Sequence, residues 1–302
     1  MYMKIILYNS LHTHHKNLKA IYDMCASCNL ELEVSSDFNR ICQQDYDILM
    51  SFNNYVDPAS IPQKIKIIYG PQFFVFPQGE LVGPLDEFLA KRCVYNALSL
   101  WVAELYRETC PHMRIPVKAF PFAVDLEAFR PSTEEKTIDC LVYIKRRAQH
   151  IINHTLSILQ SKRLNYHVIN YGSYAEEDYK SLLHKSKFMI TLDAHESQGF
   201  ALEEAMACNV PLLVLDATSM YDEKSDGHNS TYEHMKPLKL NCTSVPYWSD
   251  ICGIKITDIN EMEKAVTIMQ ESWKIYTPRK YIEETLSSKV CMERILEWYN
   301  TA

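Results

Sequence analysis

Short apolar runs alternate with amphipathic segments along the first part of the chain. The apolar runs have the length of buried strands, and the amphipathic segments repeat their apolar positions at helical spacing. They predict strands at residues 3–9, 30–34, 46–52, 64–69 and 117–122, and helices at 15–28 and 86–108. Strands separated by helices in this way are typical of βαβ units in parallel sheets.

The same alternation restarts after the polar run STEEK at 132–136, which we interpret as a domain linker. Further strands are predicted at 138–144, 165–171, 188–192 and 210–216. We therefore expect an α/β protein with two facing Rossmann-like, doubly wound domains and a ligand site in the cleft between them. The expected domains are residues 1–133 and 134–302.

The composition narrows the class of protein. With 47% hydrophobic and 23% charged residues the chain is globular, and its net charge of -7 argues against broad binding to nucleic acid or an anionic membrane. No apolar run approaches the ~20 residues that cross a bilayer. Ten cysteines without framework spacing indicate reduced thiols, as in a cytoplasmic protein.

The seven glycines are too dispersed to form GxGxxG or GxxxxGK, which excludes the usual dinucleotide enzymes and P-loop proteins. Any phosphate site must therefore use helix N-termini and basic side chains. Metal binding is not expected: His12 and His14 lack a nearby carboxylate or cysteine, and Cys25 and Cys28 form a single CxxC, which favours buried thiols.

The segment 195–216 combines features that suit a nucleotide sugar. Glu196 lies in a turn after a strand, and Glu204 follows eight positions later in a helix. The start of that helix offers free N–H groups to a phosphate or sugar, and a carboxylate can accept hydrogen bonds from a ribose diol. The pattern also fits Glu196 and Glu203 as solvated helix-start acids that complement the helix dipole, with Glu204 in a surface ion pair.

This segment resembles the E-x7-E motif of family 4 glycosyltransferases, which are retaining enzymes of the GT-B fold, in its usual setting before EAMAxxxP. Glu196 and Glu204 match the two glutamates and Gly199 matches the loop glycine. Gln198 stands where the family usually has phenylalanine.

Two further segments are similar to the same family. The phrase PFAVDLEAFRP at 121–131 resembles its interdomain phrase, and residues 281–299 resemble its closing helices, which cross back to the first domain. The run YGSY…SKFMITLDAHESQGFALEEA also resembles the branch of the family encoded by large DNA viruses of algae.

The resemblance implies a role for each candidate residue. Glu196 is the expected catalytic residue, in contact with the transferred sugar, and Glu204 is expected to bind the ribose. The loop amides that hold sugar and phosphate are those of Gly199, Phe200 and Ala201.

Three other groups of residues complete the expected site. The diphosphate is expected to be bound by Lys145, Arg146 and Arg147, whose alternative is a solvated strand end. The base is expected to be bound by Tyr171, Gly172, Ser173 and Tyr174, with buried packing of the tyrosines as the alternative. The acceptor side is expected to include Ser10, His12 and Gln72.

The implied activity is transfer of a sugar from a nucleoside-diphosphate sugar, with retained configuration, to a hydroxyl of a glycan or glycoprotein. The family favours mannose from GDP-mannose, then glucose or N-acetylglucosamine from a UDP-sugar. No cofactor or catalytic metal is expected, nor a nucleic acid partner or a transmembrane segment, and a homodimer is left open. The expected location is the cytoplasm, that of the host if the protein is virus-encoded.

Two alternatives to an active transferase stay open. The first loop lacks the glycines that relatives often carry, and Gln72 stands in a region where they often have a histidine. These departures favour a catalytically silent module that binds nucleotide sugar. A sugar-nucleotide epimerase of GT-B type is the other alternative.

Overall fold

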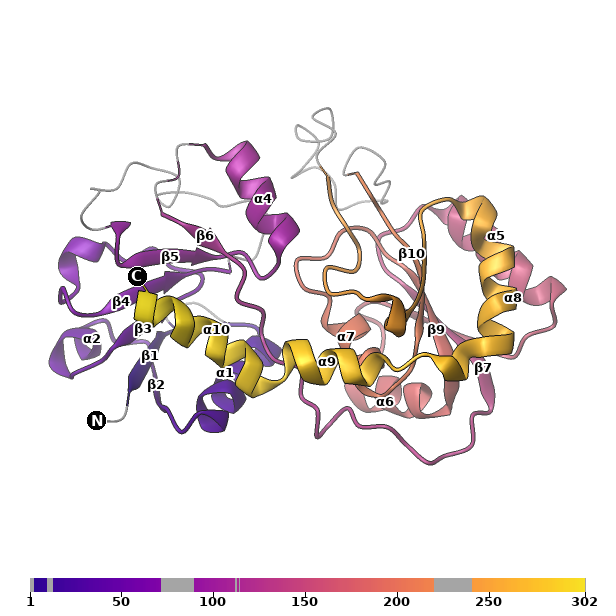
Figure 1. Ribbon diagram of the computed structural model, residues 1–302, viewed down its shortest axis with the longest axis horizontal. Helices are drawn as coiled ribbons and strands as arrows, with labels where there is room; N and C mark the ends of the chain where they lie inside the picture. Colours follow the sequence, from indigo (N-terminus) through magenta and orange to yellow (C-terminus); the bar gives the residue numbers. More distant parts are fainter. Residues whose placement is uncertain are drawn as a thin grey trace. The chain divides into compact units, whose positions relative to one another are not determined.

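The computed structural model describes residues 3–9, 13–71, 90–111, 113, 115–219 and 241–301. The chain divides into two compact units, one of residues 1–123 and 286–302 and the other of residues 124–285 (Figure 1). Residues 124–133, which the sequence assigned to the first domain, therefore belong to the second unit. Within the described ranges no helix is long and apolar enough to span a membrane.

The first unit contains a parallel sheet in the order β2-β1-β3-β4-β5-β6. Its strands are β1 (Lys4–Tyr8), β2 (Glu31–Ser35), β3 (Ile48–Ser51), β4 (Lys66–Tyr69), β5 (Cys93–Asn96) and β6 (Val117–Lys118). The described helices of this unit are α1 (His15–Ser27), α2 (Asn39–Gln43), α4 (Leu100–Thr109), α10 (Ser288–Thr301) and the short 3-10 helix η1 (Pro58–Ser60).

The helix expected over 86–108 is wrong in its first part. Strand β5 lies within that range, and helix α4 begins only at Leu100. All four residues of β5 are buried. A strand buried on both faces has a continuous apolar run, which periodicity does not distinguish from a buried helix.

The second unit repeats the same topology, in the strand order β11-β10-β9-β7-β8 with parallel pairing throughout. Its strands are β7 (Ile138–Ile144), β8 (Tyr166–Asn170), β9 (Ser186–Leu192), β10 (Leu212–Leu215) and β11 (Gly253–Ile256). Its helices are α5 (Gln149–Ser161), α6 (Glu176–Lys185), α7 (Phe200–Ala207), α8 (Met262–Ser272) and α9 (Pro278–Leu286), with 3-10 turns η5 (Asp250–Cys252), η6 (Ile259–Glu261) and η7 (Trp273–Ile275).

In both units the first strand in sequence lies between the second and the third in the sheet. The chain therefore reverses its direction of winding between β1 and β3, and again between β7 and β9. In open α/β sheets ligands bind beyond the carboxyl ends of the strands at such a reversal point.

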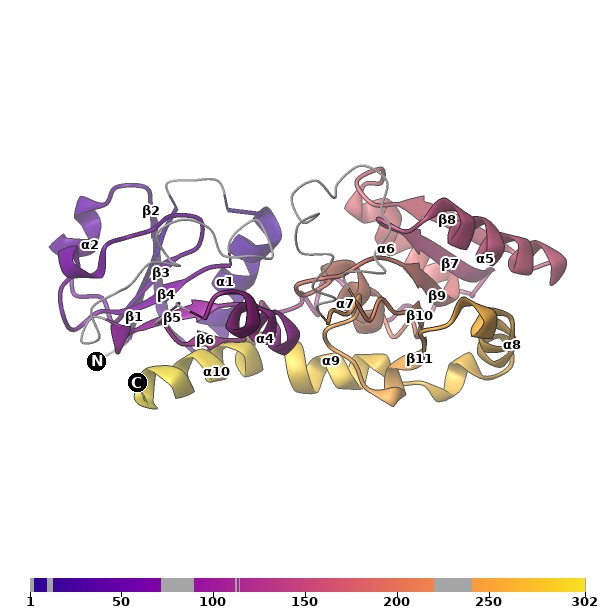
Figure 2. The ribbon, with the colours of Figure 1, turned by 90° about the horizontal axis from the view of Figure 1, so that it is seen from above.

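The last helix, α10, packs in the first unit beside α1 (Figure 2). The Trp298 ring lies 6.1 Å from the Phe120 ring. Lys66 donates a hydrogen bond of 2.5 Å to the Tyr299 carbonyl, and its ammonium lies 4.7 Å from the Tyr299 ring centroid. A cation at a helix C-terminus is favourable because the carbonyls there carry partial negative charge.

Arg92 organises the turn that precedes β4. Its guanidinium donates to four backbone carbonyls, those of Pro58 (2.5 Å), Ile61 (3.0 Å), Pro62 (2.6 Å) and Ile65 (2.9 Å). The carbonyls of Pro58 and Pro62 also accept backbone N–H groups, from Ile61 at 3.1 Å and from Ile65 at 3.0 Å. The guanidinium therefore reinforces two turns that the backbone already closes and adds a donor for Ile61 and Ile65.

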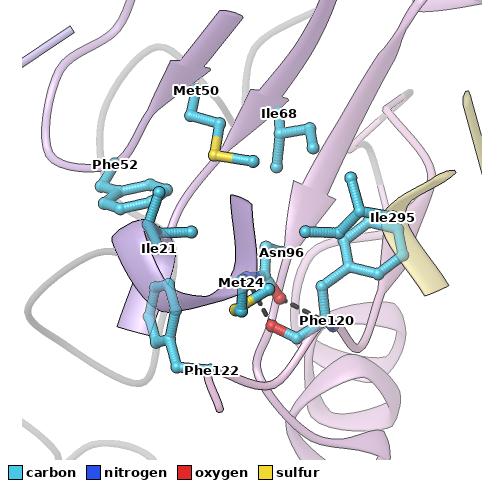
Figure 3. Close-up of a pocket in the computed structure, with 9 residues that line it drawn as sticks. All are labelled: Ile21, Met24, Met50, Phe52, Ile68, Asn96, Phe120, Phe122 and Ile295. Carbon is cyan, nitrogen blue, oxygen red and sulfur yellow. Dashed lines mark hydrogen bonds between the residues drawn. The ribbon is translucent and has the colours of Figure 1, made fainter. Parts of the chain in front are cut away.

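A small cavity in the first unit lies between α1, the sheet and α10, and its lining is almost entirely apolar (Figure 3). Asn96 is the polar side chain of the lining. Its amide donates to the Phe120 carbonyl at 2.8 Å and accepts from the N–H groups of Leu98 at 3.0 Å and Phe120 at 2.9 Å. Asn96 therefore ties the end of β5 to the segment after β6, and the cavity is a gap in packing.

Candidate functional site

The candidate site of the second unit begins where β7 and β9 end side by side. These strands pair in parallel from Ile138 to Ile144 on β7, at the point where the winding direction reverses. The Lys145 N–H donates to the Leu192 carbonyl at 2.9 Å, so the loops that follow the two strands start next to each other. The basic cluster of residues 145–147 is thereby brought to the loop that contains Glu196.

Lys145, Arg146 and Glu196 form one charged cluster. The Lys145 ammonium forms an ion pair with the Glu196 carboxylate, and each side chain is only 13% exposed. Arg146 Nη2 lies 3.7 Å from Glu196 Oε1 and 4.0 Å from Asp193 Oδ1, and donates to the His195 carbonyl at 2.7 Å. The residues expected for diphosphate and for sugar thus meet in one place.

Burial and neighbouring charges shift the pKa values of the two carboxyl groups of this cluster in opposite directions. Burial raises the pKa of Asp193 well above its usual range, and the nearby Glu196 carboxylate raises it further. Burial also raises the pKa of Glu196, but the Lys145 ammonium and a hydrogen bond with Asp193 outweigh it and lower that pKa to about 2. The pKa of Lys145 is lowered by burial but raised on balance by Glu196. The two pKa values are thus shifted in opposite directions, and Glu196 is the more readily ionised of the two carboxyl groups.

Arg147 binds backbone at the neighbouring strand end. Its Nη2 donates to the carbonyls of Leu215 at 2.9 Å and Asp216 at 3.2 Å. The guanidinium therefore holds the carboxyl end of β10 in place. Its expected contact with a diphosphate stays a prediction.

Helix α7 starts next to Glu196, at Gly199. This glycine has φ 91° and ψ 52°, a left-handed conformation that costs other residues energy. Its carbonyl accepts from the N–H groups of Leu202 and Glu203, which closes the first turn. The N–H groups of Phe200 and Ala201 have no carbonyl one turn earlier, because they begin the helix. These amides therefore lie where the dipole favours an anion.

Both glutamates inside α7 are buried, so the alternative is wrong in placing Glu203 in solvent and Glu204 in a surface ion pair. Glu203 is 1% and Glu204 is 4% exposed. Glu203 accepts a 3.0 Å hydrogen bond from Gln198, which joins the loop to the helix. Glu204 lies near Tyr174 and Tyr179, since its charge contributes to raising the pKa of both phenols, after burial.

The loop after β8 gives different environments to its two tyrosines. Tyr171 is 60% exposed, and the Lys145 ammonium lies 4.3 Å from its ring centroid. The Tyr174 ring lies 6.4 Å from that of Tyr143 and 5.2 Å from that of Tyr179, and burial raises the pKa of Tyr174 to about 12. Tyr174 thus packs inward while Tyr171 offers a ring face beside the charged cluster. Gly172, between them, has φ 76° and open space around it.

A second loop, which the sequence analysis missed, supports the site. The Asp216 carboxylate accepts hydrogen bonds from Thr243 Oγ1 at 2.9 Å, the Ser244 N–H at 2.7 Å and Ser244 Oγ at 2.9 Å. The Thr243 carbonyl in turn accepts from the Glu196 N–H at 3.0 Å. The sequence offered one clue to this loop, an aspartate at the end of the predicted apolar strand 210–216. Its hydrogen-bond partners lie about 27 residues further along the chain, which no local pattern indicates.

The acceptor-side residues Ser10, His12 and Gln72 lie outside the described residues. Near them, His14 caps α1 by accepting from the Lys16 N–H at 3.3 Å. In the parts of the chain that the structure describes, no group of three or more His, Cys, Asp or Glu side chains is arranged to hold a metal ion. Cys25 and Cys28 carry free thiols, and burial raises the pKa of Cys25 to about 12.

No protein-family model and no curated protein sequence matches the chain. Among solved structures it is similar to a glycosyltransferase from Rickettsia africae, with 10% identity, 99% of this chain and 98% of that chain covered, and a TM-score of 0.59. A sucrose-phosphate synthase from Thermosynechococcus elongatus has 9% identity, coverages of 99% and 98%, and a TM-score of 0.54. HepE from Anabaena, in complex with UDP and glucose, has 12% identity, full coverage of both chains and a TM-score of 0.53.

At such low identity the likeness shows the fold alone. The described strands form two parallel, Rossmann-like sheets, and the similar structures span the whole chain. The chain therefore has the two-domain GT-B fold of these glycosyltransferases, and the fold class expected from the sequence is confirmed.

Proposed function

We propose that this protein is a glycosyltransferase that moves a sugar from a nucleoside-diphosphate sugar to an acceptor hydroxyl. The observation that carries the proposal is the ionised Glu196, held between Lys145 and Arg146 beside the start of α7. Similar structures support it, since they include glycosyltransferases and one complex with UDP and glucose.

The charges of the cluster suit the donor's diphosphate. Lys145 and Arg146 are two cations beside the ionised Glu196, so these three side chains together keep one net positive charge. The first-turn amides of α7 add donors and the positive end of the helix dipole. Guanidinium and ammonium groups with such amides can stabilise the charge that develops on a leaving diphosphate.

We assign Glu196 to the transferred sugar and Glu204 to the ribose. In this assignment the diphosphate accepts the acceptor's proton, and the protein mainly orients the reactants and stabilises charge. The sequence resemblance adds finer features to the proposal. They are membership of family 4 and its algal-virus branch, retention of configuration and catalysis without a metal. The resemblance also favours GDP-mannose over UDP-sugars as donor and a glycan or glycoprotein as acceptor.

Calorimetric titration with UDP, GDP, UDP-glucose, UDP-N-acetylglucosamine and GDP-mannose tests the donor class. We expect one nucleotide to bind, and its sugar donor to release free nucleotide slowly without any acceptor and faster with a glycan acceptor. Absence of binding by every nucleotide would contradict the proposal. Binding without release or transfer would favour the catalytically silent module.

A further inference from the structure

Asp193 lies at the centre of the charged cluster and has an unusual hydrogen-bonding environment. It directly follows β9, and its side chain is fully buried. Oδ1 accepts the N–H of the next residue, Ala194, at 2.6 Å. Oδ2 is also buried, and no donor among the described residues forms a hydrogen bond with it. Burying an ionised carboxylate oxygen that accepts no hydrogen bond costs free energy. A protonated oxygen instead needs only an acceptor for its proton.

The groups that face Asp193 are Glu196 on its own loop, and Tyr143, Lys145 and Arg146 on β7 and directly after it. Of these, the Glu196 carboxylate favours a proton on Asp193, whereas the two cations oppose it. The cations lie closer to Glu196 than to Asp193: Lys145 is paired with Glu196, and Arg146 lies 3.7 Å from Glu196 but 4.0 Å from Asp193.

Two adjacent buried carboxyl groups cannot both ionise without strong repulsion, so the group with poorer cation contact keeps the proton. That group is Asp193. The acceptor available to its proton is the Glu196 carboxylate, with which Asp193 shares a hydrogen bond.

We propose that Asp193 is a positioning residue, which as a neutral carboxylic acid donates a hydrogen bond to Glu196 and holds that carboxylate against Lys145. This inference rests on the proposed function, in which Glu196 contacts the transferred sugar. The neutral state of Asp193 also preserves the net positive charge available to the donor's diphosphate. An ionised Asp193 would cancel that charge.

Infrared difference spectroscopy tests the protonation state without any substrate. At neutral pH the wild-type protein should show the stretch of a protonated carboxyl group that shifts in heavy water, and D193N should lack it. D139N is the matched control, because Asp139 lies on β7 of the same unit and is ion-paired with Lys187 at 2.6 Å. The band should persist in D139N, and its absence from the wild type would overturn the proposal.

Transfer kinetics test the positioning role. An asparagine amide can donate to Glu196 as the carboxylic acid does, whereas alanine cannot, so we expect D193N to keep kcat within about threefold and D193A to lose about tenfold or more. The KM for donor and the affinity for free nucleotide should change little in either variant, because Glu196 and not the nucleotide loses a partner. Equal loss in D193N and D193A, or full activity in D193A, would overturn the role.

The two proposals fail in different ways. If no nucleotide or nucleotide sugar binds the wild-type protein, the proposed function fails, and the infrared band still decides whether Asp193 is protonated. If nucleotide binds and transfer proceeds but the band is absent, only the proposal for Asp193 fails. If D193A does not fold, the spectra of the wild type and D193N and the kcat of D193N still decide the question. A folded D193N that loses kcat would contradict the expectation that its amide can donate to Glu196 in place of the carboxylic acid.

Discussion

Replacing Glu196 by glutamine removes the negative charge that opposes Lys145 and Arg146 while keeping the size of the side chain. In the free protein Glu196 is paired with Lys145 and lies 3.7 Å from the Arg146 guanidinium. A diphosphate must approach the same two cations against the repulsion of this carboxylate. The E196Q variant should therefore bind free nucleotide at least as well as the wild-type protein, although it loses the group proposed to act on the sugar.

The charges set the size of the effect. Two unit charges at ~4 Å interact by about 4 kcal/mol at an effective dielectric constant of ~20, and by about half of that at twice the distance. Salt and water screen the repulsion between the Glu196 carboxylate and the diphosphate. Removing that repulsion should therefore contribute only about 1 kcal/mol to binding, which is roughly a fivefold lower Kd for UDP or GDP. If Asp193 ionises in place of Glu196, the gain disappears and the Kd stays unchanged, so the double variant E196Q/D193N measures the full effect. Transfer should fall by about 100-fold or more, the scale seen when a charge-stabilising group is removed from an active site.

The assay combines calorimetry with free nucleotide at two salt concentrations and the rate of sugar transfer. Exposed Glu177 provides the matched control, because its side chain is 77% exposed and pairs with Lys180 on the same helix. E177Q should change neither the Kd for free nucleotide nor the rate of sugar transfer. K145A should have the opposite effect on binding, with Kd raised about tenfold or more, since it removes a cation and leaves the carboxylate of Glu196 buried.

Equal losses of nucleotide affinity in E196Q and K145A would refute this reasoning. Such a result would mean that nucleotide binding requires the intact ion pair between Lys145 and Glu196, and not the net positive charge of the cluster. The start of α7 at Gly199 would then be the main diphosphate contact.

Three further predictions follow from other contacts. E204A should weaken binding of free nucleotide diphosphate and of intact donor equally, by about 1.5–3 kcal/mol in calorimetry, because the ribose is common to both; normal binding of free nucleotide would contradict the ribose assignment. R92A should lower the unfolding free energy by about 2 kcal/mol in urea titrations, because four backbone carbonyls of the segment 58–65 lose the guanidinium, although those of Pro58 and Pro62 keep a backbone donor; a loss below about 1 kcal/mol would mean that water replaces the guanidinium. G199A should cost about 1–2 kcal/mol of stability from its left-handed backbone and also raise the Kd for nucleotide, since there is room for a methyl group but φ is 91°; unchanged stability and affinity would show that the loop adopts another conformation at no cost.

The order of strands and helices could be predicted from the sequence because periodicity is a local property. The apolar run of residues 138–144 coincides with β7, and the segment 15–28 contains α1. The expected helix over 86–108 failed in its first part because β5 is buried on both faces, and such burial depends on neighbours distant in sequence.

Part of the candidate site could also be predicted locally. The sequence indicated a helix start with free amides at Gly199, Phe200 and Ala201, and α7 begins at Phe200 with Gly199 as its N-cap. Rules of helix initiation concern residues within one turn, which a sequence displays directly.

The tertiary structure alone decided which charges meet. Lys145 and Glu196 are 51 residues apart and come together because β7 and β9 are neighbours at the reversal point of the sheet. The same pairing buries Asp193 beside Glu196, and the pairing of β9 with β10 brings Arg147 within reach of the Leu215 carbonyl. Protonation and ion pairing depend on distance and on exclusion of water, and neither quantity exists until the strands are packed.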